Sequence, residues 1–128
     1  MEPNDLGKTS TGMQANVAGL LCYVLGWITG LVFFLIEKEN KFVRFHAAQS
    51  IIVFGALTVL QIAVGILIGL FAAIHLYFLT PILGLLYPLF GLAGLVLWII
   101  LMVKAYQGEM FKLPIAGDMA DKMANKAV

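Results

Sequence analysis

The sequence predicts an all-α integral membrane bundle with three transmembrane helices, and two observations carry this prediction. Residues 45–103 contain no Asp, Glu, Lys or Arg, an uncharged run of 59 residues. A soluble domain would have to build its own surface from such a run, whereas a bilayer can surround it. The composition agrees, since the chain is 62% hydrophobic and 12% charged, with a net charge of +1. It is too apolar for a soluble domain and too balanced in charge for a nucleic-acid-binding protein.

The three predicted spans follow a polar N-terminal segment, residues 1–14. The first span covers 15–36 and ends at the charged residues that follow it. The long uncharged run has room for two further helices of about 20 residues or more, over 46–73 and 80–106. Pro88 is expected to kink the third helix, because its ring clashes with the carbonyl of the residue four positions earlier.

The cytoplasmic tail, residues 107–128, is predicted to contain a short interfacial amphipathic helix. Ile115, Met119, Met123 and Ala127 recur every four residues, which places them on one face of a helix. Such a helix would lie on the membrane surface or against the preceding cytoplasmic loop.

The distribution of basic residues sets the predicted orientation. With three spans, Lys38, Lys41 and Arg44 share one side of the membrane with the lysines from Lys104 onward, and Lys8 stands alone on the other side. The positive-inside rule therefore places the C-terminus in the cytoplasm and the N-terminus outside. Four spans, which would divide the basic residues nearly evenly, remain the alternative.

Small residues recur on each predicted span. In lipid they favour helix association, because the hydrophobic effect does not drive apolar helices together there and close van der Waals packing must stabilise the contact. The sequence leaves open whether these residues pack within one bundle or between copies of the chain. The helix-packing candidates are Gly26, Gly30, Gly65, Gly69, Gly84 and Gly91.

Four polar residues of the second predicted span and its cytoplasmic end are interaction candidates. Arg44 is placed to bind a lipid phosphate or to extend toward the interface, and His46 to titrate or to form hydrogen bonds near the headgroups. Gln49 lies close to them at the cytoplasmic end. Gln61 lies near the middle of the span, where its amide is expected to bind another helix or to line a water-filled path.

Groups suited to catalysis or to metal binding are sparse. His46 and His75 are 29 residues apart, which is about 43 Å along a helix. One cysteine, Cys22, and no acidic residue within a predicted span leave no zinc site or nucleophile–base pair to assemble. We therefore expect no enzyme activity, cofactor or metal, and an enzyme acting on lipid with His46 as base is the least favoured hypothesis.

Four segments carry a resemblance to a known family. They are residues 8–12 (KTSTG), 37–50 (EKENKFVRFHAAQS), 105–108 (AYQG) and 112–115 (KLPI). They resemble an uncharacterised family of small prokaryotic integral membrane proteins. That family is similar to the Tic-type subunit, of about twenty kilodaltons, of the chloroplast inner-envelope protein-import translocon. The resemblance implies a multi-pass protein of the cell (cytoplasmic) membrane of a prokaryote.

Two functional hypotheses follow. The favoured one is a non-enzymatic membrane subunit that assembles as a homo-oligomer or with other membrane proteins, and that is channel- or protein-translocation-like once assembled. The alternative is a membrane anchor or lipid-binding scaffold that recruits a partner through its cytoplasmic loop and tail. Both expect the lipid bilayer as a partner and no nucleic acid.

Overall fold

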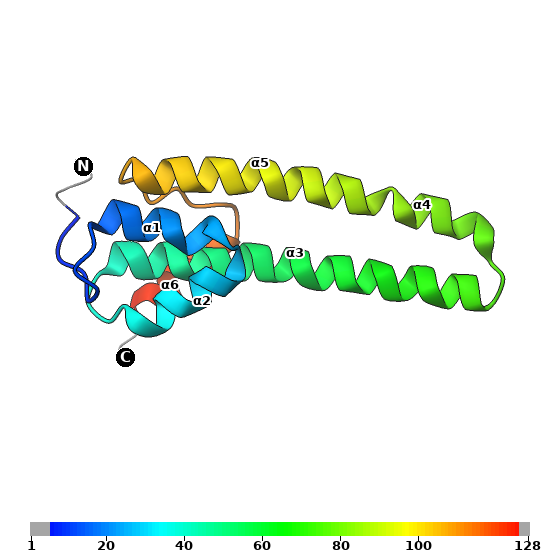
Figure 1. Ribbon diagram of the computed structural model, residues 1–128, viewed down its shortest axis with the longest axis horizontal. Coiled ribbons are helices and arrows are strands. Elements are labelled where there is room, and N and C mark those ends of the chain that lie inside the picture. The colour runs from blue at the N-terminus through cyan, green and yellow to red at the C-terminus, as the bar shows by residue number, and fades with distance from the viewer. Residues whose placement is uncertain (1–5, 126–128) are drawn as a thin grey trace.

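A computed structural model describes residues 6–125, which form α-helices joined by short turns. The elements are α1 (Ala15–Val24), α2 (Trp27–Ile36), α3 (Lys41–Ala73), the 3-10 turn η2 (Tyr77–Leu79), α4 (Thr80–Gly84), α5 (Leu86–Tyr106) and α6 (Ala116–Asn125). Figure 1 shows α3 running the length of an elongated molecule, α4 and α5 returning beside it in succession, and α1, α2 and α6 gathered at one end.

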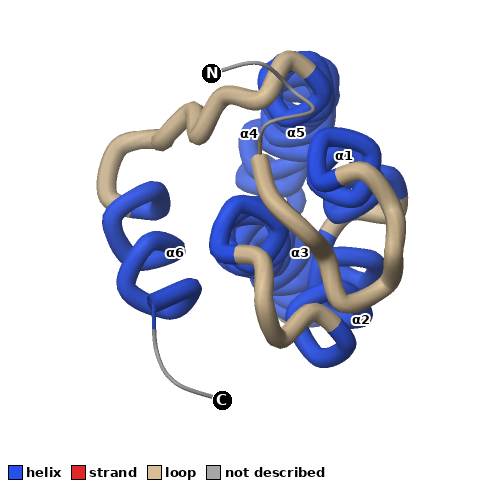
Figure 2. Tube along the Cα trace, turned by 90° about the vertical axis from the view of Figure 1, so that its left-hand side faces the viewer, coloured by secondary structure: helices blue, strands red, loops and turns tan. Residues whose placement is uncertain are grey.

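Two regions of the molecule differ in architecture. We call residues 51–103 the hairpin, because the second part of α3 and the α4–α5 segment lie side by side and are joined by a turn at the far end. We call residues 6–50 and 104–125 the head, in which α1, α2 and α6 surround the first part of α3. Figure 2 shows α6 on one side of α3, with α1 and α2 on the other.

The predicted single helix over 15–36 is instead two helices, and this corrects the first span. The chain reverses direction at Gly26, whose φ of 64° lies in the left-handed region that glycine adopts without steric penalty. Thr29 stabilises the reversal, because its hydroxyl oxygen accepts a hydrogen bond from the Leu25 amide at 3.1 Å. Each helix of ten residues is about 15 Å long, half the thickness of a hydrocarbon core.

Within residues 6–125, two helices are long and apolar enough to cross a membrane, where the sequence analysis predicts three. They are α3, with 33 residues, and the segment Tyr77–Tyr106, with 30 residues. Only 6% of the residues in the most apolar stretch of each are buried. Such exposure differs from that of a core helix in a soluble protein, which is mostly buried.

The reversal between α1 and α2 also changes where the segment before α1 lies relative to α6. The N-terminal segment, the loop between α2 and α3, and α6 all lie at the head end of the molecule (Figure 1). The predicted placement of the N-terminus opposite the C-terminus requires an odd number of crossings. The paired α1 and α2 return the chain to its starting end instead.

The return arm of the hairpin is interrupted where the sequence predicts a kink. α4 ends at Gly84 and α5 begins at Leu86, within the turn that precedes Pro88. Pro88 has no amide hydrogen to donate to the Gly84 carbonyl, so the regular bonding pattern breaks there. The Leu85 amide bonds back to Pro81 and Ile82 and keeps the two helices continuous.

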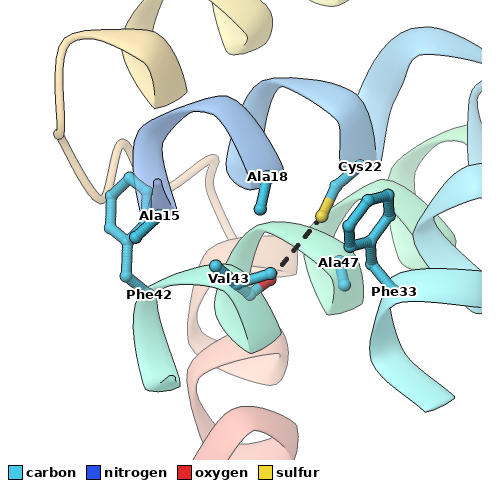
Figure 3. Close-up of a cluster of buried hydrophobic side chains, with 7 residues drawn as sticks. All are labelled: Ala15, Ala18, Cys22, Phe33, Phe42, Val43 and Ala47. Carbon is cyan, nitrogen blue, oxygen red and sulfur yellow. Dashed lines mark hydrogen bonds between the residues drawn. The ribbon is translucent and has the colours of Figure 1, made fainter. Parts of the chain in front are cut away.

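The hydrophobic core of the head is built on the first part of α3. Figure 3 shows one cluster, in which small residues of α1 let that helix approach α3 closely. The Cys22 thiol lies 3.7 Å from the Val43 carbonyl, to which it donates a weak hydrogen bond. The cluster contains Ala15, Ala18, Cys22, Phe33, Phe42, Val43 and Ala47.

The tail contains the predicted helix, α6, but with a different buried face. Its small residues Gly117, Ala120 and Ala124 are buried, the two alanines against Phe45 and Ala48 of α3. Ile115 and Met119, expected on the apolar face, are 79% and 49% exposed. Close approach of the two helix backbones explains the difference, since only small residues fit between them. Of the other two predicted residues, Met123 packs against the cluster and Ala127 lies outside the described residues.

Candidate functional site: the buried polar core of the head

The first ten residues of α3 carry an unusual set of buried polar side chains. Arg44, His46, Gln49 and Ser50 are all buried, although they lie on one helix within seven residues of one another. Burying polar groups is unfavourable unless each finds a hydrogen-bond partner. The surrounding elements supply those partners.

A hydrogen-bonded network joins α1, α3 and the tail at His46. The Glu109 carbonyl lies 2.9 Å from His46 Nε2, and because a carbonyl can only accept, the ring carries its hydrogen on that nitrogen. In the neutral imidazole, Nδ1 is then the acceptor for the Tyr23 hydroxyl, at 2.7 Å. The network therefore selects one tautomer of the neutral ring.

Gln49 extends this network and uses both ends of its amide. Its Nε2 donates to the Tyr23 hydroxyl at 3.1 Å and to the Phe111 carbonyl at 2.9 Å. Its Oε1 accepts from the Leu113 amide at 3.1 Å. Gln49 and His46 together bind three backbone groups of residues 107–115, so the tail is fixed along α3.

The environment of His46 differs from the predicted contact with headgroups. Its side chain is fully buried, and Tyr23, Phe42 and Phe45 pack edge-on around the ring at centroid distances of 5.5, 4.6 and 5.1 Å. Both ring nitrogens are already hydrogen-bonded within the chain. The residue holds the head together and does not face the lipid.

Arg44 caps the C-terminal ends of two helices at once. Its Nη1 donates to the carbonyls of Phe34 and Glu37, at 3.2 and 2.8 Å, at the end of α2. Its Nε donates to the Ala124 carbonyl of α6 at 3.4 Å. A cation is favoured at these positions, because the unpaired carbonyls at a helix C-terminus carry partial negative charge.

The guanidinium is also shielded from solvent. It lies 4.3 Å from the centroid of the Phe34 ring, and the residue is only 5% exposed. The sequence analysis expected Arg44 to bind a lipid phosphate. Its guanidinium instead binds backbone carbonyls of α2 and α6, which lie on opposite sides of α3. Arg44 thereby joins α2, α3 and α6 into one unit.

Glu37 is a buried residue that the sequence analysis did not single out. Its Oε2 accepts from the backbone amides of Ser10, Asn40 and Glu39, at 2.8, 3.1 and 3.2 Å. Burial favours a raised pKa for Glu37, but the hydrogen bonds from Ser10, Asn40 and Glu39 outweigh it, and the pKa is lowered. Glu37 therefore binds the N-terminal segment and the start of α3 as a carboxylate.

Asn40, Tyr23 and Trp98 are further residues that the sequence analysis missed. The Asn40 side chain caps α3 by accepting from the Val43 amide at 3.1 Å, and it donates to the Leu6 and Lys8 carbonyls. An Asn directly before a long helix is a recognisable capping signal. Trp98 Nε1 donates to the Tyr23 carbonyl at 2.7 Å, which depends on tertiary packing and has no local sequence signal.

The structure brings three of the four predicted polar residues together. Arg44, His46 and Gln49 lie in the head, whereas Gln61 lies in the hairpin, where its Nε2 donates to the Tyr87 carbonyl at 3.4 Å. Within residues 6–125, no three His, Cys, Asp or Glu side chains are grouped closely enough to hold a metal ion.

The six candidate packing glycines separate into two classes. A Cβ added to Gly30 would lie 2.9 Å from the Ala47 carbonyl, so this glycine packs within the chain. Gly26 forms the turn before α2, and Gly65 lies under the Tyr87 hydroxyl. The other three have no neighbour within 4 Å of an added Cβ in the described structure, and they are Gly69, Gly84 and Gly91.

Residues 8–120, which include the whole hairpin and most of the head, match the family described as the magnetosome magnetite crystal formation protein family. The chain belongs to this family. Among its relatives is UPF0132 membrane protein MJ1443 of Methanocaldococcus jannaschii, 47% identical over 117 residues, or 91% of this chain and 94% of the relative. A UPF0132 membrane protein of Archaeoglobus fulgidus is 44% identical over 111 residues, or 86% of this chain and 95% of the relative. No solved structure matches the chain.

These relatives confirm the predicted family of small prokaryotic membrane proteins. Both are named as membrane proteins, and both come from archaea. They lend no support to the predicted similarity to the Tic-type translocon subunit. Within the magnetosome magnetite crystal formation protein family, this chain is a membrane protein with an all-helical fold.

Proposed function

We propose that this protein is a non-enzymatic, multi-pass membrane scaffold, in which the hairpin anchors the head and the head recruits a partner. The distribution of charge carries this proposal. Every charged side chain of residues 6–125 belongs to the head, and the hairpin has none. A bilayer favours that separation, because a charge within the hydrocarbon core is strongly disfavoured.

The same distribution orients the protein in the proposal. Lys8, Lys38, Lys41 and Lys122 all belong to the head, together with the buried Arg44. The positive-inside rule then favours a head on the cytoplasmic face of the cell membrane, with both chain ends on that side. This arrangement replaces the N-terminus-out orientation expected from three spans.

The outer face of α6 is the surface that we propose for recruitment. Arg44 and the small residues Ala120 and Ala124 fix the helix on α3. Its opposite face presents charge, since Lys112 lies 3.8 Å from Asp118 and 3.2 Å from Asp121. A helix fixed in this way binds a partner without first having to be ordered.

The family description names magnetite crystal formation in magnetosomes. The proposal takes its membrane setting from the relatives instead, which are named as membrane proteins. The proposed partner is another membrane protein, bound through the charged face of α6.

Labelling of introduced cysteines with a membrane-impermeant maleimide tests the orientation. In a Cys22→Ala background, we expect Lys8→Cys, Lys38→Cys and Lys122→Cys to react from the cytoplasmic side. Phe78→Cys, at the far turn of the hairpin, is expected to react from the opposite side. Labelling of Lys8→Cys and Lys38→Cys from opposite sides would contradict the proposal and restore three spans.

A charge reversal on α6 tests recruitment. The Asp118 side chain is 78% exposed, so Asp118→Lys is expected to leave the fold intact. We expect the variant to lose the larger complex that the natural protein forms in gently solubilised membranes, measured by native mass spectrometry. A complex of unchanged mass and abundance would count against recruitment through this face.

A second candidate function is an oligomeric assembly that acts in translocation. The open glycines of the hairpin, Gly69 and Gly84, favour it, because small residues allow helices of different copies to approach closely. Native mass spectrometry in lipid nanodiscs should then find a defined oligomer, which Gly84→Leu disrupts. A monomer in nanodiscs would exclude a pore made by copies of this chain alone.

A further inference from the structure

A cavity of about 300 Å³ lies at the junction of the head and the hairpin, where the α1–α2 turn meets the two arms of the hairpin. Its walls come from Trp27 beside the turn, from Phe54, Thr58 and Gln61 on α3, and from Phe90 and glycines of α5. The absence of side chains at Gly91 and Gly94 provides part of the space. Among residues 6–125, those that line it are all uncharged.

Gln61 lines this cavity, and its side chain carries a hydrogen-bond acceptor that no donor of the described chain satisfies. Its Nε2 donates to the Tyr87 carbonyl, and its Oε1 is buried without a partner in the described structure. Exchanging the two ends of the amide would place Oε1 against the Tyr87 carbonyl, so that two acceptors would face each other. The Tyr87 carbonyl therefore fixes the amide, and Oε1 requires a donor from elsewhere.

The surroundings of Gln61 restrict the chemistry of that donor. The Thr58 hydroxyl donates its own hydrogen to the Phe54 carbonyl at 2.8 Å, so it can only accept from a ligand. Two acceptors among aromatic and aliphatic side chains suit a ligand that is neutral, largely apolar and equipped with a hydroxyl group.

The depth of Gln61 along α3 separates two sources of such a ligand. Gln61 lies eleven residues beyond Ser50, about 16 Å into the exposed part of α3. That distance is half the thickness of a hydrocarbon core, where a charged phospholipid headgroup is strongly disfavoured. A neutral lipid alcohol can place its hydroxyl at this depth.

We infer that this cavity binds the hydroxyl end of a neutral lipid alcohol, whose O–H group donates to Gln61 Oε1. The hydrocarbon chain of the ligand leaves the cavity toward the bilayer. The inference requires the hairpin to span the membrane, as the proposed function does, but it does not require a recruited partner. Cysteine labelling tests the span separately, so the two proposals can fail independently.

The experiment uses the full chain in lipid nanodiscs and a pair of photoreactive probes. One is a long-chain alcohol that carries a diazirine and an alkyne, and the other is the same molecule without the hydroxyl. We expect the alcohol to label peptides that contain Trp27 or Phe90, and unlabelled dodecanol to compete this labelling away. The hydrocarbon probe should label the hairpin without saturation.

Two substitutions and one control locate the site. Gln61→Leu removes the acceptor, and we expect dodecanol to compete about fivefold more weakly, the value of one ordinary hydrogen bond. Gly91→Leu fills the cavity and should abolish saturable labelling. An added Cβ at Gly91 has no neighbour within 4 Å, so this variant is expected to fold. Gly69→Leu, an equally open position that does not line the cavity, should behave like the natural protein.

Either of two results would overturn the inference. The first is equal, non-saturable labelling by the alcohol and the hydrocarbon, which would mean that the cavity takes up bulk lipid or none. The second is saturable labelling that Gly91→Leu leaves unchanged, which would place the alcohol elsewhere. If Gln61→Leu fails to fold, the comparison of Gly91→Leu with Gly69→Leu still decides the question.

Discussion

Residues 42–50 of the head are all buried, whereas within the hairpin only Val64 and Leu101 are. Both regions include α3, and both are largely apolar. The head covers its part of α3 on several sides with short helices and the tail, and it directs buried polar side chains at backbone groups. The hairpin covers its part of α3 mainly with η2 and the α4–α5 segment, and many of its apolar side chains face outward.

This difference shows that two parts of one helix can depend on different sources of stability. In the head, specific hydrogen bonds decide which segments pack together, because each buried polar group needs a particular partner. In the hairpin, stability is expected to depend on the surrounding medium, because a surface of exposed apolar side chains is favourable in lipid and not in water. Substitutions of one kind should therefore have unequal effects in the two regions.

The largest effect is expected from Arg44→Ala. The substitution leaves the carbonyls of Phe34, Glu37 and Ala124 without their charged donor, and we expect a loss of about 3 kcal/mol in the free energy of unfolding. Unfolding in detergent, followed by tryptophan fluorescence, measures it. Arg44→Lys keeps the charge but not the planar fork, and should recover only part of the loss. Natural stability in Arg44→Ala would contradict the capping role.

A matched pair of glutamine substitutions sharpens the comparison between the regions. Gln49→Leu removes three hydrogen bonds to Tyr23, Phe111 and Leu113, and we expect a loss of about 2 kcal/mol. Gln61→Leu removes one long bond and one unpaired acceptor, and should change stability by less than about 0.5 kcal/mol. Limited proteolysis should cut the tail of Gln49→Leu faster. Equal losses in the two variants would break the comparison.

A matched pair of glycine substitutions should again destabilise the head more than the hairpin, but by a smaller difference in the free energy of unfolding. Gly30→Ala places a methyl group 2.9 Å from the Ala47 carbonyl, and the resulting shift is expected to cost about 1–2 kcal/mol. Gly84→Ala adds the same group in open space and should be neutral or slightly stabilising. Thermal unfolding in the same detergent compares them. A destabilised Gly84→Ala would mean that the open glycines are contacted after all.

The smallest effect is a dependence of head stability on pH. Because the pKa of Glu37 is lowered on folding from an ordinary value of 4.5, its contribution is present above that value and is lost as the pH falls through the folded pKa. We expect the natural protein to exceed Glu37→Gln in stability by about 1 kcal/mol at pH 7. The gap should close as the pH falls below 4.5 and through the lowered folded pKa. A gap that is independent of pH would show that the carboxylate charge is not involved.

The hairpin could be predicted from sequence more fully than the head. Its spans follow from an uncharged run of 59 residues and from Pro88, which are local properties of the chain. The reversal at Gly26 was missed because an apolar run reads as one helix, whereas a glycine with positive φ and the Thr29 hydroxyl divide it. The sequence alone does not distinguish this glycine from the others.

The candidate site could be predicted only as a set of residues. Arg44, His46 and Gln49 were identified as unusual polar residues, but their partners are mainly backbone carbonyls and amides, which have no sequence signal. The buried face of α6 was missed for a related reason. Hydrophobicity favours Ile115 and Met119, whereas the close approach of two helices selects Ala120 and Ala124.

The contacts of Arg44 with two distant helix ends also determine when the head can be completed during biosynthesis. The ribosome makes α2 before the hairpin and α6 after it, yet one guanidinium binds the ends of both. In the proposed function, the hairpin therefore enters the membrane before Arg44 has its acceptor in α6, the Ala124 carbonyl. The head closes only when α6 emerges, so an incompletely translated chain would expose polar groups that quality-control proteases can recognise.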